Sequence, residues 1–518
     1  MRKAAERVLS EVAKGAKILV FGDYDTDGIT GSTIVYKGLV ALGHPESKID
    51  IELPNRELGY SIKFGYVKEY FEKPVGKDSF RDKVRKLDKV DFIITADCGT
   101  NSVDDIRKIG KEFGIPVGVT DHHHIGAEVD FGKHPAEFVV NQLRKGKDGK
   151  RTYPNEVASG SLVALKFVEA MDAVAAERGG KRVPPSVMEE LRDIAAVGVI
   201  TDVMPIVGEN SEIVKDFLLR ASKSPNPGLA YLSSKILDGS PDSARDTTLV
   251  GFGIGPRFNA GGRMDSAFRG LLTLFAKTDK ELEDIFANLN SVNSDRQSVE
   301  REVLDGLVEE AGKTAEKHRG ICAFVKDTPE REHEGIQGLL AGRVKEKFYR
   351  PTVVCTVRRD GTTKCSGRSV EGFVIIDAIT ALREYFAGGV AFGGHEYAFG
   401  GTLEKGKEAA FKKAFEAYCD EHVSDDALIR KFRCVGPVKC ATLAKYGSNV
   451  LATVEKYGPF GKDRELPFVA VDLSDSVSAV YARKKDPSVK DTFFRLKIDR
   501  EHQCSVPFFG RDDIVKVP

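Results

Sequence analysis

Short apolar runs alternate with longer amphipathic segments over roughly the first 205 residues of the chain. Runs with the length and composition of strands lie at residues 16–21, 49–53, 90–95, 117–120 and 137–140, and each is followed by turn-forming or polar residues. Such alternation of strand and helix patterns is typical of a parallel sheet with helices on both faces. Ligands of an open parallel sheet bind beyond the carboxyl ends of its strands, so we expect the chemistry of this chain there.

A different pattern runs from Lys280 to about Lys317, where apolar residues recur at helical spacing among dense charge and without Pro. This segment predicts a long helix that connects two domains. Residues from about 320 to 422 form a second apolar-rich α/β segment with clusters of Gly, and the remainder is a series of short β-rich runs. We therefore predict an α/β protein with a parallel-sheet domain over residues 1–279, a connecting helix over 280–318, a smaller α/β domain over 319–425 and a β-rich domain over 426–518.

The charges of the whole chain balance, with 78 Lys and Arg against 78 Asp and Glu. A balanced chain has no net field that attracts a polyanion, so a nucleic-acid site must be local. Residues 426–518 carry 17 Lys and Arg against 12 Asp and Glu, which slightly favours a nucleic-acid contact in the last domain.

The eight cysteines show no C-x-x-C pair and no zinc-ribbon spacing. We predict that they are reduced thiols of a cytoplasmic protein. No window approaches the roughly 18 consecutive apolar residues that span a bilayer, so no membrane partner is expected. The N-terminal stretch "MRKAAERVLSEVAKGAK" lacks the apolar core of a signal peptide and predicts an ordinary surface helix.

Three acidic residues stand at alternate positions in "LVFGDYDTDG", directly after the first apolar run: Asp23, Asp25 and Asp27. Their spacing is that of an EF-hand calcium loop, D-x-D-x-D-G. An EF-hand is excluded because Ile34 occupies the position of the bidentate Glu, and a strand pattern precedes the acids where a helix is needed. The acids therefore follow a strand of the sheet.

Further polar motifs follow other strands or helices of the same domain, in "TADCGTNS", "VTDHHHIG" and "ITDVMPI". With the first motif they give seven candidate metal ligands: Asp23, Asp25, Asp27, Asp97, His122, His123 and Asp202. Carboxylates mixed with imidazoles suit Mn²⁺ or Mg²⁺, and two cations would relieve the repulsion within such a cluster. A two-metal site of this kind activates water for phosphoester hydrolysis. Taken singly, each Asp fits a helix cap and the three His fit a surface turn, so the interpretation depends on the whole set.

These four motifs resemble, in order and spacing, the metal-binding motifs of the DHH phosphoesterase superfamily, which is named for a triplet like Asp121-His122-His123. The stretches "GIGPRFNAGGRMD", "EGIQGLLAGRVKEKFYRP", "CSGRS" and "FGGHEYAFGG" are similar to signatures of one branch, the RecJ family. This resemblance implies a single-strand-specific 5′→3′ DNA exonuclease of DNA repair and recombination that uses two Mn²⁺ or Mg²⁺ ions and releases mononucleotides. It also implies a helicase and a single-strand-binding protein as partners.

The resemblance assigns roles residue by residue. It implies that Asp23, Asp25, Asp27, Asp97, His122, His123 and Asp202 are metal ligands or their support, with catalytic roles for Asp23, Asp25, Asp97, His122, His123 and His395. The implied substrate-binding residues are Arg56, Arg257, Asn259, Arg263, Ser366, Arg368, Gly393, Gly394 and His395. Arg56 matches a residue directed at the 5′-terminal phosphate, and Ser366 with Arg368 matches a second phosphate-binding pair.

Two positions depart from the family pattern, and the last domain extends the resemblance. Phe21 stands where some relatives have a ligating His, so Asp23 is expected to take its place, and which acid bridges the metals stays open. Phe399 stands where a small Ala is typical. The last domain resembles the start of an oligonucleotide-binding fold, with strand-contacting candidates at Arg483, Lys484, Lys485 and Phe494; a charged hairpin is the equal alternative.

Two other functions remain compatible with the sequence. The first is a small-nucleotide phosphodiesterase or oligoribonuclease of the same superfamily, which a preference for dinucleotides over long strands would reveal. The second is a catalytically inactive replication scaffold on the same fold, which the intact acids and histidines argue against.

Overall fold

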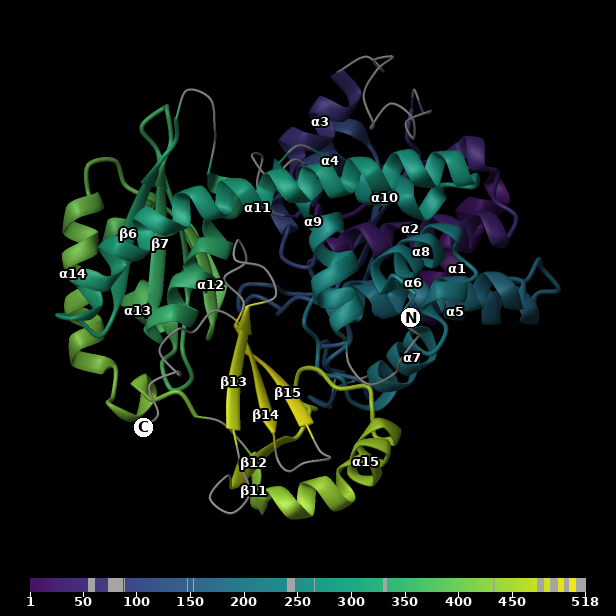
Figure 1. Cartoon of the computed structure of the whole chain (residues 1–518). Coiled ribbons are helices and arrows are strands. Elements are labelled where there is room, and N and C mark those ends of the chain that lie inside the picture. Colours follow the sequence, from purple (N-terminus) through teal and green to yellow (C-terminus); the bar gives the residue numbers. More distant parts are fainter. Residues whose placement is uncertain are drawn as a thin grey trace. The chain divides into compact units, whose positions relative to one another are not determined.

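The structure is a computed structural model that describes residues 1–54, 61–72, 87, 89–146, 148–151, 153–239, 247–264, 266–328, 333–431, 434–472, 479–484, 492–497 and 503–508. Its contacts divide the chain into two compact units, residues 1–243 with 247–430, and residues 431–518 with 244–246. The first unit contains a parallel sheet and a mixed sheet that a long helix connects (Figure 1).

The first sheet has five parallel strands in the order β2-β1-β3-β4-β5. The strands are β1 (Ile18–Phe21), β2 (Ile49–Glu52), β3 (Phe92–Ala96), β4 (Val117–Thr120) and β5 (Phe138–Val140). All five strands predicted from the sequence are therefore confirmed. Strand β1 lies between β2 and β3, so the direction in which the chain adds strands to the sheet reverses at β1. Open parallel sheets bind ligands in the crevice at such a reversal.

Helices cover both faces of this sheet. The helices of the first part of the chain are α1 (Arg2–Lys14), α2 (Thr26–Ala41), α3 (Phe64–Glu72), α4 (Val103–Phe113), α5 (Gly160–Glu177) and α6 (Pro185–Thr201). Ile18 and Val20 of β1 face the core that includes α2, α5 and α6, whereas Leu19 and Phe21 face the core that includes α3 and α4. Every residue of β1 is buried for this reason, which explains why its sequence is apolar without alternation.

A helical segment leads from this sheet to the second one. It comprises α7 (Gly208–Leu218), α8 (Pro227–Leu237), a π-helical turn at Leu249–Ile254, α9 (Gly255–Met264), α10 (Phe268–Phe275) and α11 (Asp279–Ala315). Helix α11 is the long helix predicted from the sequence. It begins with a capping box, in which the Thr278 side chain accepts from the Glu281 N–H and the Glu281 side chain accepts from the Thr278 N–H.

The second sheet has the strand order β6-β7-β8-β10-β9, with β6 and β7 parallel and the other pairs antiparallel. Its strands are β6 (Ile321–Lys326), β7 (Thr352–Val357), β8 (Thr363–Arg368), β9 (Phe392–His395) and β10 (Ala398–Leu403). Its helices are α12 (Gln337–Phe348), α13 (Ile375–Ala381) and α14 (Glu408–His422). Helix α12 packs with α11 over one face, and the apolar residues of α13 and α14 pack against the other (Figure 1).

The cysteines of this sheet correct one sequence expectation. Cys355 of β7 and Cys365 of β8 lie directly opposite each other and form a disulfide. The prediction that all eight cysteines are reduced is therefore wrong for this pair, because the strand register that brings them together could not be read from their spacing along the chain. Four other cysteines in the described residues, Cys98, Cys322, Cys419 and Cys434, are free thiols.

The second compact unit is rich in strands, as predicted. Its elements are β11 (Cys434–Lys439), α15 (Cys440–Lys456), β12 (Phe468–Asp472), β13 (Ala479–Lys484), β14 (Thr492–Lys497) and β15 (Gln503–Phe508). Strands β11 and β12 pair in parallel, and β13, β14 and β15 form an antiparallel sheet. Its assignment as an oligonucleotide-binding fold stays a prediction. In the part of the chain that the structure describes, no helix combines the length and apolar character needed to cross a bilayer.

An ion-pair cluster ties α11 to α12, and it generates a stability prediction. Glu300 is buried and accepts hydrogen bonds from Arg296 on its own helix (2.6 Å) and from Arg343 on α12 (2.9 Å). Glu300→Ala leaves Arg296 buried without its carboxylate, and we expect the free energy of unfolding to fall by about 2 kcal/mol in urea titrations. This expected loss of free energy is smaller than that for breaking a fully buried ion pair, because the Arg343 side chain is 66% exposed. Glu309→Ala, which removes an exposed pair with Lys313 on the same helix, should leave the urea midpoint unchanged.

Candidate metal and phosphate site

The three acids of the first motif surround the start of α2. Strand β1 ends at Phe21, and the chain turns into α2 with Asp25 as its N-cap, whose side chain accepts from the Gly28 N–H at 3.0 Å. Asp23 lies in this turn and Asp27 in the first helical turn, and both are almost fully buried. Carboxylates are favoured at a helix N-terminus, so the strand-turn-helix unit by itself gathers negative charge at this edge of the sheet.

Asp97 is the first residue after β3 and lies next to β1 at the reversal point of the sheet. Its φ of 65° is the left-handed conformation, and its N–H donates to Thr120 O of the neighbouring strand end at 3.0 Å. The first residue of α5 packs directly against its carboxylate, since a Cβ added to Gly160 would lie 2.4 Å from Asp97 Oδ1. Gly160 is therefore required for α5 to approach the site.

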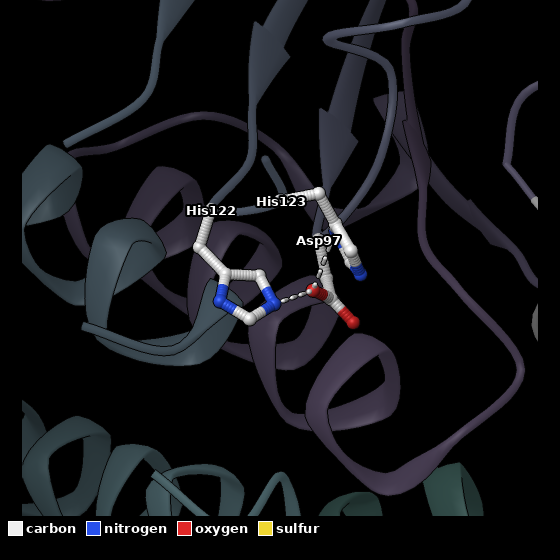
Figure 2. A group of neighbouring side chains, drawn as sticks. All are labelled: Asp97, His122 and His123. Atoms are coloured by element: carbon white, nitrogen blue, oxygen red, sulfur yellow. Dashed lines mark ion pairs between the residues drawn. The ribbon is translucent and has the colours of Figure 1, made fainter. Parts of the chain in front are cut away.

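His122 lies close to three carboxylates, and Figure 2 shows one of them, Asp97. Its Nε2 is 3.2 Å from Asp97 Oδ1, 3.5 Å from Asp202 Oδ2 and 4.0 Å from Asp27 Oδ2. His123 joins from the same loop, with Nδ1 at 3.9 Å from Asp97 Oδ1 (Figure 2). The structure thus brings together all seven residues that the sequence proposed as ligands, in three overlapping groups whose ligand atoms lie within 4.8 Å of one another: Asp97 with His122 and His123, Asp27 with His122 and Asp202, and Asp23 with Asp25 and Asp97.

The charge of this cluster requires cations. Burial raises the pKa of Asp97 well above its usual value, and the negative charges of Asp27, Asp25, Asp202 and Asp23 raise it further. A divalent cation among these oxygens would remove that penalty, because it favours the ionised carboxylates. The donor set of carboxylate oxygens and imidazole nitrogens, without a thiolate, fits Mn²⁺ or Mg²⁺.

Asp121 supports the two histidines instead of facing the cluster. Its Oδ1 accepts from the His122 and His123 N–H groups and lies 2.8 Å from His123 Nδ1, and its Oδ2 accepts from the Thr100 N–H. Burial opposes ionisation of Asp121, but the hydrogen bond and charge of His123 bring its pKa below the usual range. Burial likewise lowers the pKa of His123, and Asp121 overcomes this effect and raises it to about 9. We infer that Asp121 sets the tautomer and orientation of His123.

Two amide side chains after β5 fix the histidine loop, and the sequence analysis did not select them. Asn141 Nδ2 donates to His123 O at 2.9 Å, and Gln142 Nε2 donates to His122 O and to Ala158 O. Ala158 O is also 3.2 Å from His122 Nδ1, which directs the lone pair of Nε2 to the acids. The available signal was "VVNQL", a pair of amides at the carboxyl end of the fifth predicted strand.

Two residues of the first motif, Asp27 and Phe21, make contacts inside the protein that explain their positions. The Asp27 carboxylate accepts from the N–H groups of Gly160 (2.6 Å) and Ser161 (3.0 Å) at the start of α5. Phe21, which replaces the ligating His of some relatives, is fully buried and packs edge-on against Tyr66 at 5.7 Å between ring centroids. Asp23, two residues later, is the group that reaches the cluster.

The second sheet carries the other predicted residues on one face. One row of directly paired residues across β8, β10 and β9 consists of Arg368, Ala398 and His395. Two positions along the strands, a second row consists of Ser366, Gly400 and Gly393. Directly paired residues project to the same face of a sheet, so Ser366, Arg368 and His395 share a face. The Arg368 guanidinium donates to Ser366 Oγ and to Gly367 O, and it lies 2.9 Å from where a Cβ on Gly338, in the first turn of α12, would be.

Arg368 has the properties of an anion-binding residue. Burial lowers its pKa, and within the described residues no carboxylate pairs with it. A buried guanidinium beside a helix N-terminus is stabilised when an anion lies between them. The sheet face next to it is open, because an added Cβ would meet nothing within 4 Å at Gly393 and only Cys365 O, at 3.9 Å, at Gly400.

Phe399 belongs to the opposite face. It is buried in the core under α13 and α14, and a Cβ on Gly367 or Gly394 would clash with it. The aromatic ring therefore fills the space over Gly367, on the face opposite to that of Arg368 and His395.

The predicted substrate residues of α9 make structural contacts. Asn259 Oδ1 accepts from the N–H and the hydroxyl of Thr26, both at 2.9 Å, and so holds the first motif. Arg257 donates to Asn290 on α11 and to Gly253 O, and Arg263 donates to Gly335 O of the second sheet domain at 3.0 Å. Arg56 and Lys485 lie outside the described residues, whereas Arg483 and Lys484 end β13 and Phe494 lies in β14.

Comparison with known protein families gives two matches within the first unit. Residues 17–199 match the model of the DHH family N-terminal domain, and residues 318–421 match the DHHA1 domain. The first matched region contains every residue of the acidic cluster except Asp202.

Curated relatives and a solved structure agree with these matches. The chain is 29% identical over 470 residues to the single-stranded-DNA-specific exonuclease RecJ of Salmonella typhimurium, covering 89% of this chain and 75% of the relative. It is 32% identical over 419 residues to RecJ of Thermus thermophilus, covering 81% of this chain but only 54% of that relative. The crystal structure of Thermus thermophilus RecJ in complex with Mn²⁺ has a TM-score of 0.74 and 26% identity, and the similarity covers 100% of this chain and 67% of the other. Because the two matched regions make up more than half of the chain and the similarity extends over its whole length, the chain belongs to the DHH family.

Proposed function

We propose that this protein is a metal-dependent exonuclease that hydrolyses single-stranded DNA from the 5′ end and releases mononucleotides. The observation that carries the proposal is the convergence of Asp97, Asp202 and Asp27 on one imidazole nitrogen of His122. Its relatives of similar sequence, named as single-stranded-DNA-specific exonucleases, support the choice of substrate.

The chain supplies a preorganised set of ligands. Asp23, Asp25, Asp97, His122, His123 and Asp202 face the cluster and would hold two divalent cations, with Asp27 as a further ligand or as their support. When bound, such cations activate a water molecule for attack on phosphorus and neutralise the charge that develops on the phosphate. Asp121, Gln142 and Ala158 fix the two imidazoles, so no reorganisation is needed when the phosphate arrives.

The cluster is partly exposed to solvent, and Asp25 is half-buried. Asp23, Asp27 and Asp97 are almost fully buried, whereas the Asp202 and His123 side chains are 26% and 36% exposed. We place the entry of the scissile phosphate on the side of Asp202 and His123, because these two side chains are exposed to solvent whereas Asp23, Asp27 and Asp97 are buried.

The second sheet domain would bind the strand. Arg368 and Ser366 form a phosphate-binding pair, and His395, which is exposed on the same sheet face, would donate a hydrogen bond to a phosphoryl oxygen. Arg56 is proposed for the 5′-terminal phosphate from the family resemblance. A fixed phosphate site at a set distance from the cations would give single-nucleotide products from one end.

The alternatives are less well supported. A small-nucleotide phosphodiesterase shares the acidic cluster but not the sequence similarity to RecJ over most of the chain. An inactive scaffold does not account for a complete set of seven ligand candidates. We further propose, from the family resemblance, that a helicase and a single-strand-binding protein supply the substrate, and that the protein acts in the cytoplasm in DNA repair and recombination.

The first prediction from the proposed function tests the reaction. With Mn²⁺ and single strands labelled at either end, the protein should release mononucleotides from the 5′ end, and Asp97→Asn should lower kcat at least about 10³-fold, beyond the 10- to 100-fold typical of outer-shell partners. Asp104→Asn, an exposed carboxylate on α4, should retain activity. Cleavage of circular and linear strands at equal rates would contradict the proposal. Hydrolysis of dinucleotides alone, without hydrolysis of long strands, would also contradict it.

The second prediction concerns the approach of α5 to the cluster. Gly160→Ala places a methyl group against Asp97, and we expect Mn²⁺ affinity, measured by electron paramagnetic resonance, to fall by about 10- to 100-fold. Gly110→Ala is the matched helical control, because a Cβ there meets nothing within 4 Å. Equal Mn²⁺ affinity in the two variants would show that Asp97 does not depend on this close packing.

The third prediction tests the phosphate pair. Arg368→Gln should raise KM for a 5′-phosphorylated strand by about 10- to 100-fold, because a charge-assisted hydrogen bond to phosphate is lost, with a smaller change in kcat. Arg359→Gln, an exposed arginine at the turn between β7 and β8, should leave KM unchanged. A loss confined to kcat would assign Arg368 to the chemical step instead.

A further inference from the structure

Helix α6, which ends at Asp202, is followed by a valine in a backbone conformation that favours glycine. The end of the helix is a Schellman motif, in which the Val203 N–H donates to Ile200 O and the Met204 N–H donates to Val199 O, both at 3.1 Å. The first residue after the cap of such a motif takes the left-handed conformation, and Val203 accordingly has a φ of 55°.

A valine fits this conformation poorly. Its branched side chain crowds the backbone when φ is positive, so the conformation costs free energy that glycine would not lose. Helix α1 of the same chain ends in the same motif, but with Gly15 at the corresponding position (φ 66°). The Gly15 N–H donates to Val12 O and the Ala16 N–H donates to Glu11 O, at 3.0 and 3.1 Å. Glycine would therefore make the end of α6 more stable.

Packing in the protein interior does not account for Val203. Its side chain is 60% exposed, whereas the next residue, Met204, packs against the large core of the parallel-sheet domain. Within the described residues, none of the hydrophobic cores includes Val203. The side chain thus buries little apolar surface that could offset the backbone strain. Strained residues that the fold itself does not require are found at functional sites.

Val203 lies beside the exposed part of the metal cluster. It follows Asp202 directly, and the Cα atoms of consecutive residues are about 3.8 Å apart. The Asp202 carboxylate is 3.5 Å from His122 Nε2, and its side chain is 26% exposed, on the side where we place the entry of the scissile phosphate. An exposed apolar side chain at this point would meet the nucleotides that flank that phosphate.

We propose that Val203 makes an apolar contact with a base next to the scissile phosphate and so helps to hold the strand at the cluster. This inference rests on the proposed function. Every base has a flat face that can pack against a side chain, so the contact holds the strand irrespective of its sequence. It accounts for a valine at a position where glycine would be more stable.

Stability and strand binding should respond to Val203→Gly in opposite directions. The variant relieves the backbone strain, so the thermal midpoint should rise by about 1–2 °C. KM for a 5′-phosphorylated single strand should rise at least threefold, with less than a twofold change in kcat. Asp238→Gly is the matched control and should leave KM unchanged, because Asp238 is exposed and ends α8 in the same conformation (φ 47°). An unchanged KM in Val203→Gly, or a lower thermal midpoint, would overturn the proposal.

Two further variants test the side chain itself. Asparagine tolerates the left-handed conformation but is polar, so Val203→Asn should raise KM as Val203→Gly does. Val203→Ile keeps a branched apolar side chain and should stay within twofold of the wild type. Mn²⁺ affinity, measured by electron paramagnetic resonance, should be equal in all variants. A normal KM in Val203→Asn would assign the effect to backbone flexibility, and a loss of Mn²⁺ affinity would assign it to a displaced Asp202; either result would overturn the contact.

Strands with abasic sites at the first two nucleotides identify the group that is contacted. With such a strand, Val203→Gly should change KM less than 1.5-fold, because the base that Val203 contacts is already absent. An equal change in KM on abasic and intact strands would overturn the base contact. A wild-type protein that hydrolyses no single strand would refute the proposed function instead, and the contact is then tested by the dissociation constants of the same strands in fluorescence anisotropy.

Discussion

Repulsion among buried carboxylates is the constraint on which this structure depends. Asp97 is fully buried beside four other aspartates, and its pKa is raised by burial and by their charges. Such a cluster persists only where surrounding groups hold each carboxylate in place and where cations neutralise the set. The protein provides the first condition through backbone N–H groups, in that Asp25 caps α2 and Asp27 accepts from the start of α5.

The topology of the sheet explains why the charge gathers at one point. Because β1 lies between β2 and β3, the residues that follow β1 and β3 meet where the strand order reverses, and the histidine loop after β4 reaches the same place. Helix α5 then closes the site, and this approach is possible only because Gly160 leaves room for Asp97. Metal ligation and close helix packing are therefore parts of one arrangement.

Helices α9 and α11 connect the two sheet domains. Helix α9 holds the first motif through Asn259 and reaches the second sheet domain through Arg263. Helix α11 meets α12 through the buried Glu300, and α12 begins beside Arg368. In the second sheet, the pairing of β8, β10 and β9 puts Ser366, Arg368 and His395 on one face, while Phe399 fills the core on the other. The two halves of the proposed active site are thus connected by a few hydrogen bonds and helix contacts.

The sequence by itself determined the features that depend on local pattern. Five strands, the long helix and the acids at strand ends were predictable because burial on both faces, helical periodicity and strand-end polarity are visible within a few neighbouring residues. The motif order also predicted that Asp23, Asp97, His122 and Asp202 would meet. Tertiary structure alone decided the supporting roles: that Asp121 faces His123, that Gln142 holds the His122 loop, that Asn259 bonds to Thr26, and that Cys355 and Cys365 pair. Among these four contacts, that of Asn259 with Thr26 joins residues far apart in the chain, and all four depend on strand register and side-chain direction, which no local pattern encodes.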